Sequence, residues 1–256
     1  MKKLSILLLF IPIFLGARPL SKEARISLMT CAPGNELYSA FGHSAIRVKD
    51  PKQGLDIVYG YGTFDFSDPL FLPKFIKRDL MYFLDTDKYG EFQYVYKYFK
   101  RSFDEQILDL DSIQTQRIYD FLKNNMKAEN RFYLYDFFFD NCATRIRDVL
   151  YNELGPELKI EGKDEEGELT FRDILDLYLQ ESHWMDFGID LALGAVVDKK
   201  ATPWEQTFHP DYLAAFFQDA KLGGKHLVES KSRIYDAPPA VKTTSFFIRP
   251  LFLVSL

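Results

Sequence analysis

Residues 43–61, HSAIRVKDPKQGLDIVYGY, decide the fold class. Alternation in the first seven residues places His43, Ala45 and Arg47 on one face of a strand. The turn sequence DPKQG at residues 50–54 then leads into a second strand, LDIVYGY. The segment therefore predicts an antiparallel hairpin.

Strands and helices are both predicted outside this hairpin. RISLMTC, at residues 25–31, is typical of a buried strand that ends at a Pro-Gly-Asn turn. Apolar residues at helical spacing predict four helices, with Ser112 as the N-cap of the first. These helices cover residues 112–126, 141–154, 171–180 and 211–221. Because no repeat or long linker interrupts the pattern, we expect one α+β domain.

The composition excludes several classes of protein. The chain has 256 residues, 32 Lys and Arg against 37 Asp and Glu, and a net charge of −5, with no dense basic run. A nucleic-acid partner is therefore not expected, since phosphate binding requires a basic surface. Aromatic residues make up 16% of the chain, which excludes a disordered protein, and two cysteines exclude a disulfide-rich scaffold.

The N-terminal segment predicts export. Two lysines precede an apolar run at residues 4–15, and the small residues Gly16 and Ala17 follow it. This is the pattern of a signal peptide at residues 1–17, cleaved to leave a periplasmic domain at residues 18–245. An uncleaved N-terminal anchor is the alternative, although the run is short for a membrane span.

The C-terminal segment allows two interpretations. The sequence SFFIRPLFLVSL is apolar except for one arginine, and residues 246–256 form a separate tail in our domain assignment. It is either a final core strand or the beginning of a membrane segment, which would hold the domain close to a membrane.

Searches for standard motifs exclude common chemistries. The sequence has no G-x-S-x-G, H-E-x-x-H, C-x-x-C or Walker motif, and its four histidines lie far apart. We therefore expect no metal or other cofactor. The acidic stretch at residues 161–168 lacks the spacing of a calcium loop and is expected to be a solvated loop.

Two segments remain as candidates for chemistry. In PGNELYSAFGHSAIRV, residues 33–48, His43 opens a strand, and in YDFFFDNCATRIRDVL, residues 135–150, Cys142 begins a helix. A helix N-terminus favours the thiolate form of a cysteine, which is the nucleophile. A histidine on an adjacent strand would pair with the thiolate or accept the thiol proton, and the backbone N–H of Cys142 would stabilise an oxyanion.

Four segments in order between about residues 27 and 220 resemble the bacterial Lnb N-terminal periplasmic domain family: PGNELYSAFGHSAIRV, YGYGTFDF, ENRFYLYDFFFDNCATR and TFRDIL. A histidine that precedes an Asn-Cys helix start is also similar to the circularly permuted NlpC/P60 branch of the papain-like superfamily. The resemblance implies a papain-like α+β fold, in which an antiparallel sheet packs against helices. It also implies that Cys142 is the nucleophile and His43 the base.

The resemblance implies a third, orienting residue on the strand after that of the histidine. Tyr59, Tyr61 and Asp65 are the candidates, and we favour Asp65 or Tyr61.

Three further residues near the two segments are candidates for substrate binding. These are Ser39, Asn141 and Arg145. The alternative roles are a helix cap for Asn141 and a surface salt bridge for Arg145.

Two functions are compatible with these features. The first is an exported cell-envelope thiol hydrolase or acyltransferase that acts on an amide, ester or thioester bond through a cysteinyl acyl intermediate. Its substrate would be a peptidoglycan peptide or a lipid acyl group. The second is a non-catalytic periplasmic binding or assembly module, and a Cys31–Cys142 disulfide, common in exported proteins, would silence the nucleophile.

Overall fold

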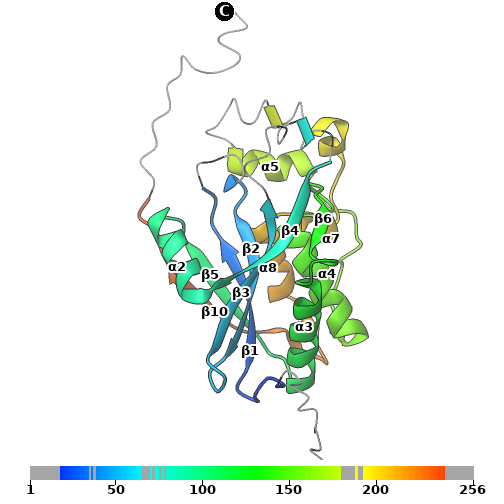
Figure 1. Cartoon of the computed structure of the whole chain (residues 1–256). Helices are drawn as coiled ribbons and strands as arrows, with labels where there is room; N and C mark the ends of the chain where they lie inside the picture. The colour runs from blue at the N-terminus through cyan, green and yellow to red at the C-terminus, as the bar shows by residue number, and fades with distance from the viewer. Residues whose placement is uncertain are drawn as a thin grey trace, which may run out of the picture.

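The computed structural model describes most of the chain between residues 18 and 239 (Figure 1). The described residues are 18–34, 36, 39–64, 70, 73–74, 77, 79–179, 188–189 and 193–239. The predicted signal peptide, Asp65 and the tail at residues 246–256 lie outside them.

Within the described residues, seven strands form one antiparallel sheet in the order β10-β5-β1-β2-β3-β4-β6. The strands are β1 (Arg25–Cys31), β2 (His43–Asp50), β3 (Leu55–Phe64), β4 (Met81–Lys88), β5 (Phe103–Leu108), β6 (Phe132–Leu134) and β10 (Val228–Tyr235). The predicted hairpin is confirmed, since β2 pairs with β3 and Ala45 lies opposite Gly60. The strand predicted at residues 25–31 is β1.

Helices cover both faces of the sheet (Figure 1). Their bounds are α2 (Tyr89–Tyr98), α3 (Ser112–Asn125), α4 (Cys142–Leu154), α5 (Phe171–Leu179), α7 (Pro203–Gln206) and α8 (Pro210–Gln218). Two 3-10 turns (Gly155–Glu157 and Gly194–Asp198) and a small sheet of β7 (Leu158–Lys159), β8 (Lys221–Leu222) and β9 (Lys225–His226) complete the described elements. The predicted α+β class, a large antiparallel sheet packed against helices, is therefore confirmed.

The four predicted helices are present, with small differences at their ends. Helix α3 is capped by Asp111 and not by Ser112 as predicted, because the Asp111 carboxylate accepts the N–H groups of Ile113 and Gln114. Helix α8 ends at Gln218, before the predicted end at residue 221, because the chain turns there into β8. No described helix is long and apolar enough to cross a membrane.

Alternation along β2 divides its side chains between two cores. Ile46 and Val48 belong to the main core, which α3, α4 and α8 cover. Ala45 belongs to a second core on the other face, together with Phe92 of α2 and Phe103 of β5. A third cluster packs around α5.

Candidate functional site

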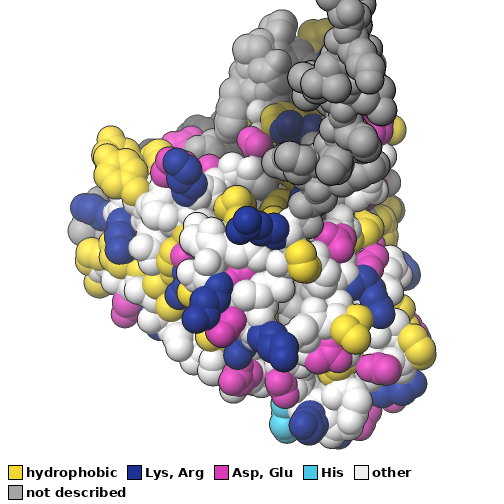
Figure 2. All heavy atoms as spheres, turned by 60° about the horizontal axis from the view of Figure 1, so that its bottom comes forward, with side chains coloured by type: hydrophobic (Ala, Val, Ile, Leu, Met, Phe, Trp, Pro, Cys, Tyr) yellow, Lys and Arg dark blue, Asp and Glu magenta, His cyan; other side chains and the backbone are white. Residues whose placement is uncertain are grey.

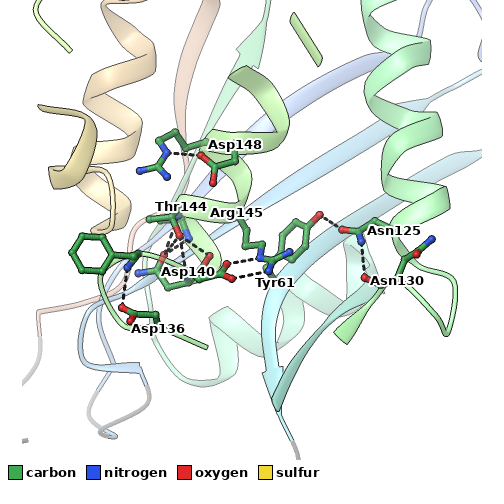
Figure 3. Close-up of polar contacts among 12 residues, drawn as sticks. Tyr61, Asn125, Asn130, Asp136, Asp140, Thr144, Arg145 and Asp148 are labelled. Atoms are coloured by element: carbon green, nitrogen blue, oxygen red, sulfur yellow. Dashed lines mark hydrogen bonds and ion pairs between the residues drawn. The ribbon is translucent and has the colours of Figure 1, made fainter. Parts of the chain in front are cut away.

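Cys142 is the first residue of α4, and the residue before it fixes this helix start. The Asn141 side chain accepts hydrogen bonds from the N–H groups of Ala143 (2.8 Å) and Thr144 (3.0 Å). In return, the Thr144 hydroxyl accepts the Asn141 N–H at 2.7 Å, which completes a capping box (Figure 3).

The amide nitrogen of Asn141 ties this helix start to two loops. It donates to the carbonyl groups of Phe137 and Phe208, at 2.8 Å each. Asn141 is buried, so its amide is fully used by the fold. Of its two predicted roles, substrate binding and helix cap, the structure displays the cap.

Main-chain N–H groups surround the Cys142 sulfur. The sulfur accepts hydrogen bonds from the N–H groups of Ser44, Ala143 and Cys142 itself. These bonds and the charge of Arg101 lower the pKa of the thiol, but its burial is the larger effect and raises the pKa above the usual value. The predicted thiolate is therefore wrong for this structure, because a sequence pattern does not report desolvation.

Gly62 of β3 lies between the thiol and the predicted base. A methyl carbon in place of its hydrogen would lie 3.5 Å from Cβ of Cys142 and 3.9 Å from Cε1 of His43. A similar carbon at Gly60 would lie 3.3 Å from Nε2 of His43, so the imidazole lies over two glycines. Gly62 also has a φ of +104°, which favours glycine.

His43 approaches from the α2 face of the sheet. It lies opposite Cys31 of β1, which belongs to the second core, whereas Cys142 packs against the main core. Burial, followed by the charge of Arg101, lowers the pKa of His43 to about 4. The structure thus brings together a neutral imidazole and a neutral thiol at pH 7.

Three tyrosines from β4 and β6 and the segment after β6 lie near the thiol. Tyr82 stacks on Tyr135 with ring centroids 4.2 Å apart, and it lies 6.3 Å from Tyr133. Burial raises the pKa values of all three phenols, and the charge of a Cys142 thiolate would raise them further. A thiolate at Cys142 would therefore have several phenol groups within electrostatic range.

Two buried hydroxyl groups in this region were not recognised from the sequence. The Tyr133 hydroxyl and the Ser44 hydroxyl have no hydrogen-bond partner among the described residues. A buried donor without a partner costs free energy, and such donors accumulate where a ligand supplies the partner. The signals were present but weak, since Ser44 directly follows His43 and Tyr133 lies in the motif that precedes Cys142.

Tyr61 and Arg145 lie on the helix side of β3 (Figure 3). The Tyr61 hydroxyl donates to Asn125 of α3 at 2.5 Å. Arg145 forms a bidentate ion pair with Asp140 and lies 4.1 Å above the Tyr133 ring. The predicted salt bridge of Arg145 is confirmed, and neither side chain is brought to the His43 imidazole by a contact in the described structure.

Ser39 and Asp65 complete the predicted set. Ser39 lies in the connection between β1 and β2, where its buried hydroxyl donates to the Glu36 carbonyl at 3.0 Å. Asp65 directly follows the end of β3 and lies outside the described residues.

The predicted alternative of a disulfide is wrong for the described structure, in which both cysteines are free. Cys31 is buried in the second core, where it shares a hydrogen bond with Tyr96, and burial raises its pKa to about 12. It is therefore a core thiol.

Among the described residues, no three His, Cys, Asp or Glu side chains converge as metal ligands. The chemistry that this region displays is thus that of a thiol, an imidazole and hydrogen-bond donors.

Comparison with known proteins gives one result. The model of the Lnb N-terminal periplasmic domain family matches residues 20–177, a range that includes both His43 and Cys142. No curated protein and no solved structure matches the chain significantly.

Proposed function

Because the chain belongs to the Lnb N-terminal periplasmic domain family, we propose that it is a cell-envelope thiol hydrolase or acyltransferase with a permuted papain-like fold. We further propose that residues 1–17 direct export and are cleaved. The observation that carries the enzymatic proposal is the position of Gly62, which contacts the neighbourhoods of both His43 and Cys142. A nucleophile and a base on either side of one glycine are arranged for proton transfer between them.

In the first step, the Cys142 sulfur attacks the carbonyl carbon of an amide, ester or thioester. The new C–S bond forms while the thiol proton passes to the His43 imidazole. The carbonyl π electrons move to oxygen, and the resulting oxyanion is stabilised by N–H donors such as that of Cys142. A neutral starting pair suits this order, because the charge separation develops only when substrate is present.

In the second step, the tetrahedral intermediate collapses and the bond to the leaving group breaks. The His43 imidazolium returns its proton to the leaving amine, alcohol or thiol, and an acyl group remains on Cys142. Water or an acceptor then attacks the thioester, which distinguishes a hydrolase from an acyltransferase. We propose an envelope peptide or a lipid acyl group as the substrate.

We assign the orienting role beside His43 to Asp65. It lies one residue beyond β3, the strand that carries Gly60 and Gly62 against the imidazole. Tyr61 is less suitable, because its hydroxyl already donates to Asn125.

Acyl transfer to the thiol tests the enzymatic proposal. The folded chain is incubated with an activated aryl ester, and mass spectrometry then locates the acyl group. We expect a thioester on Cys142 that is absent from Cys142→Ser and strongly reduced in His43→Gln. Cys31→Ala serves as the control and retains the adduct, whereas equal acylation of wild type and His43→Gln would contradict the proposal.

One observation favours a non-catalytic module as the second candidate. Burial raises the pKa of Cys142 and lowers that of His43, so the pair carries no charge at pH 7. A binding module would keep this neutral pair at every stage and would form no acyl adduct with any ester or thioester of the envelope.

A further inference from the structure

Helix α2 is apolar on both of its sides. Phe92 and Tyr96 point into the second core, as expected for a helix that covers a sheet. Its outer side also carries large apolar side chains, with exposed fractions between 47% and 68%, and they continue one residue past its end. These side chains are Tyr94, Val95, Tyr98 and Phe99, and we call them the outer surface of α2. A surface helix normally carries polar residues on its outer side, so this one requires an explanation.

The aromatic rings of this surface form one continuous patch. Tyr94 stacks on Tyr98 at a centroid distance of 6.2 Å, and Tyr98 meets Phe99 edge to face at 5.1 Å. Lys97 and Lys100 are exposed in the same segment. Tyrosine rings flanked by lysines are typical of protein that contacts the headgroup region of a bilayer, where the ring lies in the apolar layer and the ammonium reaches the phosphates.

The described C-terminal end of the chain lies beside the same helix. Tyr235, the last residue of β10, packs on Phe103, and the N–H of Ala237 donates to the Ser102 hydroxyl at 2.8 Å. Ser102 is three residues beyond Phe99. The chain therefore leaves the domain close to the outer surface of α2, and the apolar sequence SFFIRPLFLVSL follows within ten residues.

Other charged regions offer a weaker explanation for membrane contact. Figure 2 shows one face of the molecule with basic and acidic side chains interspersed, which gives no field of a single sign. Attraction to anionic lipid would instead be local, from the lysines beside the aromatic rings.

We infer that the outer surface of α2 rests on the surface of an anionic phospholipid bilayer. Tyr94, Tyr98 and Phe99 enter the headgroup region, while Lys97 and Lys100 bind lipid phosphates. This contact does not depend on thiol chemistry, so Cys142→Ser is expected to bind membranes as the unsubstituted chain does.

Vesicle binding by the full chain tests the inference. We expect co-sedimentation with vesicles of phosphatidylethanolamine and phosphatidylglycerol, and weaker binding to vesicles of phosphatidylcholine alone. The double variant Tyr98→Ser, Phe99→Ser should bind the first vesicles about tenfold more weakly, because two interfacial side chains are lost. Ile113→Ser is the matched control, since Ile113 is 70% exposed on α3 across the sheet, and it should bind normally.

A second measurement locates the contact. Tryptophan fluorescence of Tyr98→Trp should be quenched by brominated acyl chains beyond the background of the unsubstituted chain, and that of Ile113→Trp should not. The inference is overturned if the full chain ignores anionic vesicles, if the double variant binds them as tightly as wild type, or if the Tyr98→Trp variant shows no quenching above that background. A dimer that the double variant converts to a monomer would also overturn it, because a second copy would then cover the surface.

Discussion

The main-chain N–H of Ser44 donates a hydrogen bond to the sulfur of Cys142. This bond connects β2 to the first residue of α4, and it places the thiol against the residue that follows His43. The sheet and the helix therefore fix the relative positions of the predicted base and nucleophile directly, without an intervening loop.

The Cys142 thiol should react as a buried thiol in the substrate-free protein. Burial raises its pKa above the usual value, so the rate of alkylation by iodoacetamide should reach its midpoint above about pH 8.5. Arg101→Gln should move the midpoint higher still, because the charge of Arg101 lowers this pKa. The pH dependence is measured on the Cys31→Ala background, and a midpoint below pH 8 would contradict the structure.

Acid should destabilise the fold through His43. Its pKa falls from 6.5 in the unfolded chain to about 4 in the folded protein, so between these values the unfolded state binds a proton that the folded state does not. Its contribution is complete above pH 6.5 and is lost as the pH falls towards 4. Between pH 7 and pH 5, His43 alone should lower the free energy of unfolding by about 2 kcal/mol.

Urea unfolding at several pH values measures this loss. His43→Gln should remove the His43 share and leave that of His209, whose pKa burial lowers to about 3. A substitution of exposed His226 controls for the loss of an imidazole. If His43→Gln and wild type lose the same stability between pH 7 and pH 5, the imidazole is not buried as described.

Gly62→Ala should disturb both the fold and the thiol. The positive φ alone costs about 1 kcal/mol, and the contacts with Cys142 and His43 raise the cost to about 1–3 kcal/mol. Gly54→Ala is the matched control, because Gly54 also has a positive φ but a methyl group there would meet nothing within 4 Å. Alkylation of Cys142 should change only in Gly62→Ala, and identical behaviour of the two variants would argue against a role for Gly62 in spacing the pair.

Tyr133→Phe should separate stability from chemistry. Its buried hydroxyl has no partner among the described residues, so removing it should leave stability unchanged or increase it by up to about 1 kcal/mol. If the hydroxyl donates to the oxyanion, the same change should slow acylation of Cys142 by about tenfold or more. Tyr61→Phe provides the contrast, because it loses the bond to Asn125 and should lower stability by about 1 kcal/mol. A Tyr133→Phe variant that is clearly less stable than wild type would contradict the missing partner.

The sequence predicted the elements whose polarity alternates clearly. The strands β1, β2 and β3 and the helices α3, α4, α5 and α8 have one apolar face each, and their patterns are visible in the sequence. Helix α2 was not predicted because it is apolar on both sides and so lacks the contrast that identifies an amphipathic helix. Strand β6 has three residues, too few to establish a period.

The site was only partly predictable for a different reason. His43 and Cys142 belong to recognisable motifs, but their pKa values depend on burial by residues from several elements. The capping role of Asn141 follows from local sequence, whereas its bond to Phe208 joins positions 67 residues apart. The buried hydroxyls of Ser44 and Tyr133 gain their meaning only from what surrounds them.

The place of β10 in the sheet has a consequence for biosynthesis. This strand pairs with β5, more than a hundred residues earlier in the chain, so the edge of β5 stays unpaired until the ribosome has made residues 228–235. An unpaired strand edge invites association with other chains. The protein is therefore expected to depend on a chaperone or on rapid completion of synthesis, and a fragment that stops near residue 177 should aggregate.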